Sequence, residues 1–386
     1  MSTPARPLRI AVIGLTHPFR GGIAHYTTVL CRALGAKHTT QLFALKRQYP
    51  GLLFPGSTQL DNSDRPIEID HQPCLDSLNP LSWFGTYRRI RDFQPDLLLI
   101  SWWHPFLAPA FGSVARLCRR FARIPVCFLC HNALPHERSW IDNVLLRYAY
   151  STAAAFIAHS QEDADNLQLF RPDADVRKNP HPAYDEFGAD TAPTQAAARE
   201  ELGLTGKRVL LFFGFIRAYK GLQYLLEAIE RLPATDAYHL LVVGEFYEPA
   251  SDYPALAGLV SENRLTLVNR YVANEEVPKF FAAADLLVVP YVTATQSGVI
   301  QIAYSFDVPV IATRVGGLPE VVDDGATGFL VSPRSSDALV TAIQKYYAAD
   351  PATFRRGIET ARHPYSWDRM VSTVEAVAEA VQNPPP

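Results

Sequence analysis

The sequence has few cysteines and no long apolar run. Five cysteines in 386 residues is an odd number for a long chain, which argues against a disulfide framework and fits a reducing compartment. Cys127 and Cys130 have C-x-x-C spacing but lie in an apolar run, so we expect them in the core of a strand. The longest apolar stretches have the length of strands, and residues 1–7 are too polar for a secretory signal. The sequence therefore predicts a cytoplasmic protein without a membrane-spanning helix.

Three chemical signatures are also missing. A G-x-G-x-x-G dinucleotide fingerprint would be expected after the first apolar strand, and Gly14, Gly21 and Gly22 do not supply it. No carboxylates are paired as in glycosidases, so hydrolysis is not favoured. Asp323 and Asp324 precede a glycine and are typical of a turn rather than of an Asp-x-Asp metal site. The sequence thus predicts no metal and no bound cofactor.

The length and the charge distribution indicate two different domains. A chain of this length exceeds what one core usually holds. Residues 1–160 contain 17 Lys and Arg against 9 Asp and Glu, whereas the remainder contains 19 and 30. A basic first domain suggests an anionic partner such as a membrane surface or a lipid phosphate. A chance spread of surface charge is the alternative, and no nucleic-acid partner is expected.

The most informative stretch of the sequence covers residues 285–333. It reads as a buried strand, a polar loop, a helix, a second buried strand, a glycine loop, a short helix and a third strand. Apolar runs that do not alternate are typical of parallel strands covered on both faces. Each loop follows the carboxyl end of a strand and precedes a helix, which is where α/β sheets bind ligands and where free N–H groups favour a phosphate.

Three sequence motifs in this stretch resemble those of a known family. Residues 308–313 read VPVIAT, residues 315–322 read VGGLPEVV, and residues 325–331 read GATGFLV. Their order and spacing resemble the GT-B glycosyltransferases of family 4, also called group 1. The resemblance implies an α/β protein with two Rossmann-like, doubly wound domains that face a cleft. It places an acceptor-side domain at 1–185, a linker at 186–205, a nucleotide-sugar domain at 206–364, and a helix returning to the first domain at 365–386.

The resemblance also implies site residues in the first domain. Gly21 and Gly22 match a Gly-Gly pair of the family that lets the backbone approach the donor diphosphate and the acceptor. The alternative is a tight turn without a role in binding. His131 follows a strand at 126–130, where family members carry a histidine that contacts the donor sugar. Its neighbour is Asn132 instead of the usual aspartate. A structural histidine is the alternative.

In the second domain two cations stand between a strand at 208–213 and a helix from 222. Arg217 and Lys220 are predicted to bind a diphosphate from two sides, because the positive end of the helix dipole adds to both of their charges. This resembles the family motif that stabilises the departing nucleotide, although Arg217 stands two residues later than usual. The resemblance further implies donor contacts at Gly244, after the next strand, and nucleobase contacts by the backbone of Tyr271 and Val272.

The sequence departs from the family at one point. Family 4 members usually carry Glu-x7-Glu, and the corresponding positions here are Ala294 and Ile302. Between them lie hydroxyl, amide and backbone groups that suit a diphosphate at a helix N-terminus. We interpret this as a variant donor site made by Thr295, Gln296, Ser297, Gly298 and Val299.

The resulting hypothesis is a retaining, metal-independent hexosyltransferase-type enzyme. It would move a sugar from a nucleotide-diphosphate donor to a glycan or lipid-linked acceptor in envelope or extracellular polysaccharide synthesis. Two alternatives are a GT-B nucleotide-sugar 2-epimerase and a non-catalytic sugar-nucleotide-binding protein. Basic, aromatic helices at 81–92 and around Arg116, Arg119 and Arg120 suggest peripheral attachment to an anionic membrane, at the inner face of the plasma membrane. The alternative for both helices is a helix that packs on the sheet with one face and exposes a basic face to solvent.

Overall fold

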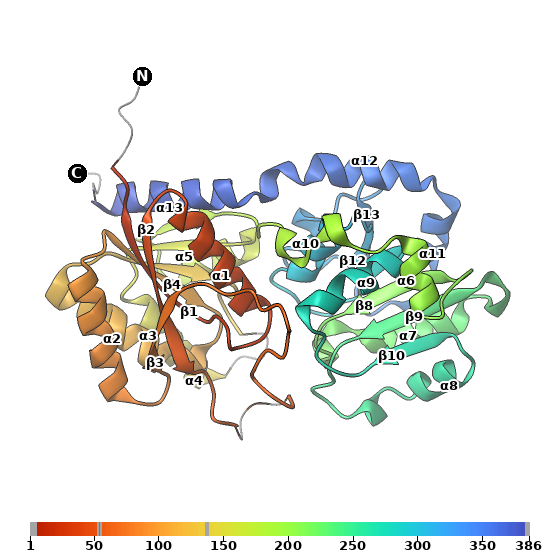
Figure 1. The fold of residues 1–386 in the computed structure, drawn as a ribbon, viewed down its shortest axis with the longest axis horizontal. Helices are drawn as coiled ribbons and strands as arrows, with labels where there is room; N and C mark the ends of the chain where they lie inside the picture. Colours follow the sequence, from red (N-terminus) through yellow and green to blue (C-terminus); the bar gives the residue numbers. More distant parts are fainter. Residues whose placement is uncertain (1–5, 52–53, 55, 136–138, 383–386) are drawn as a thin grey trace. The chain divides into compact units, whose positions relative to one another are not determined.

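The computed structural model describes residues 6–51, 54, 56–135 and 139–382. The chain divides into two compact units (Figure 1). The first contains the chain up to Asp61, Pro66–Pro180 and the C-terminal part from Ser366. The second contains Asn62–Arg65 and His181–Tyr365.

The first unit is built on a seven-stranded parallel sheet with the order β3-β2-β1-β4-β5-β6-β7. The strands are β1 (Arg9–Gly14), β2 (Thr39–Arg47), β3 (His71–Asp76), β4 (Leu97–Trp102), β5 (Val126–Cys130), β6 (Ala155–Ala158) and β7 (Asp175–Lys178). The order reverses between β1 and β4, so the ligand crevice of such a sheet is expected outside the carboxyl ends of these two strands.

Helices cover both faces of this sheet. One face is packed by α1 (Gly22–Gly35) and α13 (Trp367–Gln382), whose apolar residues share a core with Ile10, Val12 and Leu99. The other face is covered by α2 (Pro80–Phe93), α3 (Ala108–Leu117), α4 (Trp140–Tyr150) and α5 (Gln161–Phe170). The last turn after α3 is a π-helix, Cys118–Ala122. None of the helices in the described residues is both long and apolar enough to cross a membrane.

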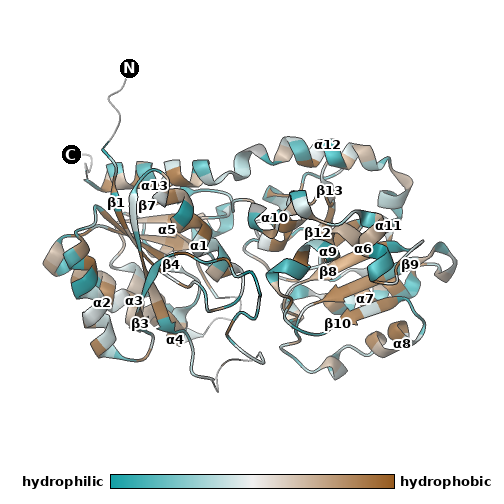
Figure 2. Ribbon diagram, viewed as in Figure 1, coloured by the Kyte–Doolittle hydropathy of each residue, from teal (hydrophilic) through white to brown (hydrophobic). Residues whose placement is uncertain are grey.

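The second unit is built on a six-stranded parallel sheet with the order β10-β9-β8-β11-β12-β13. Its strands are β8 (Arg208–Phe213), β9 (Tyr238–Val243), β10 (Leu265–Val268), β11 (Leu286–Val289), β12 (Val310–Thr313) and β13 (Gly328–Val331). The brown bands of Figure 2 follow strands of both sheets, as expected for parallel strands buried on two faces. The prediction of two doubly wound α/β sheets is confirmed.

Seven helices belong to the described part of the second unit. They are α6 (Gln195–Glu201), α7 (Leu222–Arg231), α8 (Ala255–Ser261), α9 (Val277–Ala283), α10 (Gly298–Ser305), α11 (Ser336–Ala348) and α12 (Pro351–Ala361). One apolar core lies under α9 and α10, and another lies under α7, α8 and α11. The sheet order reverses between β8 and β11, so the loops that follow these two strands lie at the switch point.

Two segments differ from their appearance in the sequence. Residues 186–205, expected as a linker, contain two 3₁₀ turns and α6, which packs on α9: Arg199 pairs with Asp285 at 2.7 Å and donates to the Ala283 carbonyl. Asn62–Arg65 clusters with the second unit, where Ser63 Oγ accepts from the Asn274 amide at 2.9 Å. Short polar segments of this kind acquire structure from tertiary contacts, which a sequence pattern does not display.

Candidate functional site

In the first unit the predicted glycines stand at the turn between β1 and α1. Gly21 has φ 101°, a left-handed conformation that favours glycine, and its carbonyl accepts the amides of Ala24 and His25 to start α1. Gly22 begins the helix and is exposed. Gly14 ends β1, where a methyl group would lie 2.6 Å from Thr27 Cγ2. The turn therefore keeps its backbone accessible, as the predicted role of Gly21 and Gly22 requires.

His131 follows β5 and is buried in a polar and aromatic cluster. Its amide donates to the Trp102 carbonyl at 2.8 Å, which ties it to the end of β4. Its Nε2 and Ser101 Oγ are joined by a hydrogen bond of 2.9 Å, and the Tyr26 ring meets the imidazole edge-on at 4.6 Å. The ring orientation is thus fixed from two sides. Its contact with a donor sugar stays a prediction.

A second histidine lies beside the first one. His159, after β6, is 5.5 Å from the His131 ring and shares the Tyr26 contact. Its Nδ1 is 2.9 Å from the Asn179 carbonyl, and burial lowers the pKa of His159 to about 4. His159 is therefore neutral at physiological pH and fills the cluster as an uncharged ring. The sequence analysis did not single it out.

In the second unit the turn between β8 and α7 holds the predicted cations. Gly214 (φ 98°) ends β8, and a methyl group there would lie 3.0 Å from Lys220 Nζ and 3.8 Å from Val299 Cγ2 of α10. Gly221 (φ 67°) starts α7, and a methyl group there would lie 2.0 Å from the Pro290 carbonyl oxygen. The Lys220 amine and Val299 of the first turn of α10 thus both lie beside Gly214.

The Lys220 amine is buried, and it forms no ion pair within the ranges that the structure describes. Its side chain is 8% exposed, and Nζ lies over the Tyr291 ring at 5.6 Å. Burial, and then repulsion from the Arg217 guanidinium, lower the pKa of Lys220 to about 7. No carboxylate in the described part of the chain raises that pKa. A buried amine in this state favours a ligand with negative charge, because such a ligand would restore its usual pKa.

The loop before α10 carries the predicted hydroxyls. Thr295 and Ser297 are buried, whereas Gln296 is half-buried. Ser297 is the N-cap of α10 but its side chain caps no helix amide, and it hydrogen-bonds Tyr291 instead. The amides that open the helix at Gly298 and Val299 are therefore not occupied by that cap.

The positions of the missing carboxylates are apolar. Ala294 and Ile302 are both buried in the core under α9 and α10. One residue before Ile302, the Gln301 side chain is 1% exposed, and its amide atoms have no hydrogen-bond partner within the described ranges. Gln296 Oε1 shares that property. Sequence reasoning missed Gln301; its signal was a polar residue within an otherwise apolar helix.

Arg217 and Tyr271 belong to one layer of aromatic rings. The Arg217 guanidinium lies over the Tyr247 ring at 4.8 Å, Tyr247 packs on Phe215 at 4.6 Å, and Phe215 stacks on Tyr271 at 6.3 Å. Val272, beside Tyr271, is buried. Flat rings of this kind suit a planar base, which agrees with the predicted place of Tyr271 and Val272 but does not test it. Phe215 and Tyr247 were not among the predicted residues.

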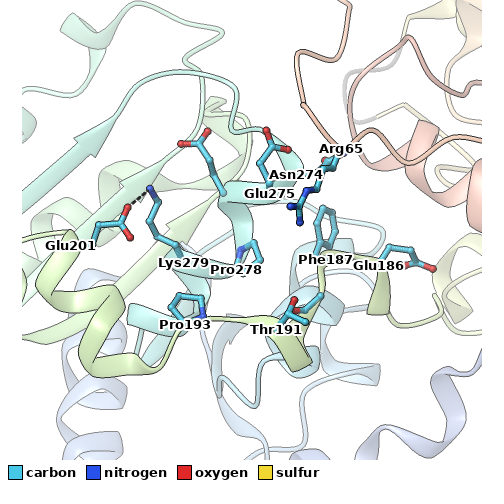
Figure 3. A pocket seen from close by; sticks show the side chains of 12 residues that line it. Arg65, Glu186, Phe187, Thr191, Pro193, Glu201, Asn274, Glu275, Pro278 and Lys279 are labelled. Carbon is cyan, nitrogen blue, oxygen red and sulfur yellow. Dashed lines mark hydrogen bonds and ion pairs between the residues drawn. The ribbon is translucent and has the colours of Figure 1, made fainter.

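A cavity lies elsewhere in the second unit (Figure 3). It measures about 490 Å³ and is lined by Arg65, Glu186–Gly188, Thr191, Pro193, Glu201 and residues 274–276, 278 and 279. Several of its charged groups already have partners: Lys279 pairs with Glu201 at 2.8 Å, Glu276 pairs with Arg270 outside the cavity, and Glu275 accepts from the Asp64 amide at 3.0 Å. None of the predicted site residues lines it. We therefore assign it no ligand.

Gly244 provides a test of the backbone geometry on which the site depends. It follows β9 with φ 151°, and a methyl group there would lie 2.1 Å from the Gly214 carbonyl oxygen. We expect Gly244→Ala to lower the free energy of unfolding by about 3 kcal/mol or more, since backbone must move at both glycines. Chemical denaturation measures the change. In the control Gly258→Ala, where nothing lies within 4 Å, helix α8 should gain about 0.5–1 kcal/mol; equal effects would contradict the close approach.

Both halves of the chain match sequence profiles of one enzyme family. Residues 20–181 match the profile described as Glycosyltransferase Family 4, and residues 207–349 match Glycosyl transferases group 1. TuaC of Bacillus subtilis, named as a teichuronic acid biosynthesis glycosyltransferase, is 30% identical over 321 residues, which are 78% of this chain and 74% of TuaC. The chain belongs to the family 4 glycosyltransferases.

Other relatives match over shorter stretches. The D-inositol 3-phosphate glycosyltransferase of Mycolicibacterium gilvum is 30% identical over 228 residues, which are 58% of this chain. The matched stretch spans 51% of that relative's length, about half of it.

Solved structures show the same fold. Sucrose-phosphate synthase from Thermosynechococcus elongatus has a TM-score of 0.71 at 22% identity, over 97% of this chain and 99% of that one. HepE of Anabaena in complex with UDP has a TM-score of 0.73 at 18% identity, over 97% of this chain and 100% of that one. These likenesses confirm the GT-B fold that the sequence predicted.

Proposed function

We propose that this family 4 protein is a retaining, metal-independent enzyme that transfers a sugar from a nucleotide-diphosphate donor. The acceptor is the hydroxyl of a glycan or of a lipid-linked saccharide. The observation that carries the proposal is the buried Lys220 amine, which lies beside Gly214, as Val299 of α10 does, and pairs with no carboxylate among the described residues. A diphosphate supplies an anion for this amine and accepts hydrogen bonds from the opening amides of α10.

The chemistry follows from where charge develops. The bond between the anomeric carbon and the β-phosphate oxygen breaks, and its electron pair remains on the departing nucleotide. The acceptor oxygen bonds to the anomeric carbon from the same face and gives its proton to the phosphate oxygen that departs. The departing diphosphate is stabilised by Lys220, Arg217 and the amides of Gly298 and Val299. Stabilisation of developing charge by preorganised donors is usually the largest single contribution to the rate enhancement of an enzyme. Because these groups are the protein's own, no metal is required for that step.

The remaining predicted residues receive roles around this centre. Tyr271 and Val272 contact the base, and Gly244 with Gly21 and Gly22 gives the donor backbone contacts at close range. His131, with its ring fixed by Ser101 and Tyr26, contacts the donor sugar. Thr295, Gln296 and Ser297 take over sugar and ribose contacts from the carboxylates that are absent at Ala294 and Ile302. Gln301 joins them as a buried amide that a sugar hydroxyl would satisfy.

The relatives support a choice of donor and pathway. HepE of Anabaena has been solved with UDP and with UDP-glucose. The name of TuaC assigns it to teichuronic acid biosynthesis. We therefore propose a UDP-sugar as the first donor to test and an envelope or extracellular polysaccharide as the product. A lipid-linked acceptor would also bring the protein to the cytoplasmic face of a membrane.

A thermal-shift screen against UDP, GDP, ADP, dTDP and their sugar conjugates tests the donor. A ligand that binds only the native state stabilises it by about 2.7 kcal/mol at 100 times its Kd. We expect one diphosphate to raise the melting temperature and its sugar conjugate to be turned over once an acceptor is added. NMR of the product should show the donor's anomeric configuration.

The same screen distinguishes the alternatives. A 2-epimerase would interconvert the free nucleotide sugar without any acceptor. A non-catalytic protein would bind the nucleotide and leave the conjugate intact. A protein that shifts with none of the four diphosphates would contradict the proposed donor site.

A further inference from the structure

Helix α4 exposes apolar side chains on the outer surface of the first unit. Trp140, Ile141 and Val144 are 77%, 50% and 58% exposed. Trp140 and Val144 are four residues apart and lie on one side of the helix, with Tyr148 one turn further. A tryptophan with two aliphatic neighbours in water is costly unless something covers it.

The same surface carries a strong positive charge. The helices α2, α3 and α4, with the π-helix, contain seven arginines, no lysine and two aspartates. All seven arginines are exposed: Arg88, Arg89, Arg91, Arg116, Arg119, Arg120 and Arg147. Both aspartates are engaged, because Asp92 pairs with Arg91 and Asp142 completes the capping box of α4. The charge on these three helices and the π-helix is therefore almost entirely positive, whereas α5, on the same face of the sheet, carries Glu162, Asp163 and Asp165.

The structure joins the apolar and the basic parts. Arg116 of α3 lies over the Tyr148 ring at 4.8 Å and donates to the Tyr148 carbonyl at 3.1 Å. Arg119 donates to the Ser151 carbonyl at 3.2 Å. Arg116 of α3 and Arg119 of the π-helix thus lie at the C-terminal end of α4, where Tyr148 follows Val144 by one turn. Further exposed apolar residues on the neighbouring helices are Leu81, Phe84 and Phe121.

We propose that this surface docks the protein on an anionic phospholipid bilayer. Charge complementarity selects the occupant, since exposed arginines next to tryptophan and aliphatic side chains match the headgroup region and the upper acyl chains of such a membrane. The proposal rests on the proposed function in that a lipid-linked acceptor would be met at this membrane. Arg116 and Arg119 also hold the end of α4, so their role includes its position.

Vesicle sedimentation of the full chain tests the surface. We expect binding to vesicles of phosphatidylcholine with about 30% phosphatidylglycerol, weaker binding at high salt, and little binding to phosphatidylcholine alone. The variant Trp140→Ser/Ile141→Ser/Val144→Ser and the variant Arg120→Gln/Arg147→Gln should each lower the partition coefficient by about tenfold or more. Emission from Trp140 should shift to shorter wavelength on binding, and Trp140→Phe should remove that shift.

Matched controls separate the surface from general effects. Leu169→Ser removes an apolar residue that is 80% exposed on α5, and Arg355→Gln/Arg356→Gln removes two exposed charges from α12. Both should bind vesicles as the wild type does. Equal loss in controls and surface variants would overturn the proposal, as would absence of binding to anionic vesicles. A wild-type dimer that the surface variants dissociate, seen by sedimentation velocity, would assign the surface to a second copy instead.

The donor screen keeps the two proposals apart. The surface variants should retain the nucleotide-dependent rise in melting temperature, because none of the changed residues belongs to the proposed donor site. Vesicle binding without any nucleotide shift would leave the docking surface standing and contradict the proposed function. A rise in melting temperature with a nucleotide, without any vesicle binding, would support the proposed function and contradict the docking surface.

Discussion

Replacing Lys220 by methionine is expected to lower kcat/KM for sugar transfer by about 100- to 1,000-fold, the usual cost of removing one group that stabilises developing negative charge. Methionine fills similar space, so the packing against Tyr291 and Gly214 should persist. The melting temperature should stay the same or rise, because the variant no longer buries an amine. Steady-state kinetics with the donor found in the screen gives the measurement.

Lys345 supplies the matched control for this substitution. It is exposed on α11, and Lys345→Met makes the same chemical change away from the site. Its kcat/KM should stay within about twofold of the wild type. Near-normal transfer by Lys220→Met would remove the lysine from the proposed diphosphate contact, whatever the control does.

The affinity for the nucleotide diphosphate is expected to fall about tenfold for each pH unit above 7. In the free protein burial lowers the pKa of Lys220 to about 7, so the amine is charged below that pH and mostly neutral above it. A bound diphosphate favours the charged form and raises that pKa. Below pH 7 the lysine is protonated before and after binding, so affinity does not depend on it. Above pH 7 binding requires the uptake of one proton.

Isothermal titration in two buffers of different ionisation enthalpy measures that proton directly. Near pH 8 we expect uptake approaching one proton per ligand bound, and at pH 6 close to none from Lys220. Lys220→Met should bind more weakly at pH 6 and lose the decline in affinity between pH 7 and pH 9. A wild-type affinity that stays flat over this interval would contradict the assignment of the low pKa to the amine that meets the phosphate.

The fold could be predicted well where a segment was long, apolar and buried on two faces. The strands at Val126–Cys130 and Arg208–Phe213 coincide with those expected from their apolar runs. β3, by contrast, lies in a stretch, residues 46–80, whose many turn formers and lack of strong periodicity predict a long loop, because the strand is short, polar and contains Pro73. Proline lacks an amide donor and is tolerated at a sheet edge, which is where β3 lies. Its partner β2 is far away in sequence, so no local pattern could show it.

The sequence by itself determined the fold class, the family and the loops that follow the strands. Non-alternating apolar runs predict parallel strands. Motifs such as VGGLPEVV can be recognised from the sequence because glycine is required where the backbone turns with positive φ, as at Gly316. Residue types and spacing are enough for such statements. They are local properties of the chain.

Only the tertiary structure decided which side chains meet and what their charges do. The low pKa of Lys220 arises from burial and then from repulsion by Arg217, and Ser101 fixes the ring of His131 from a different strand. Arg116 of α3 reaches the C-terminal end of α4 only because both helices pack on one face of the sheet. Desolvation and proximity depend on distances in space, and these are set by packing between segments that the sequence keeps far apart.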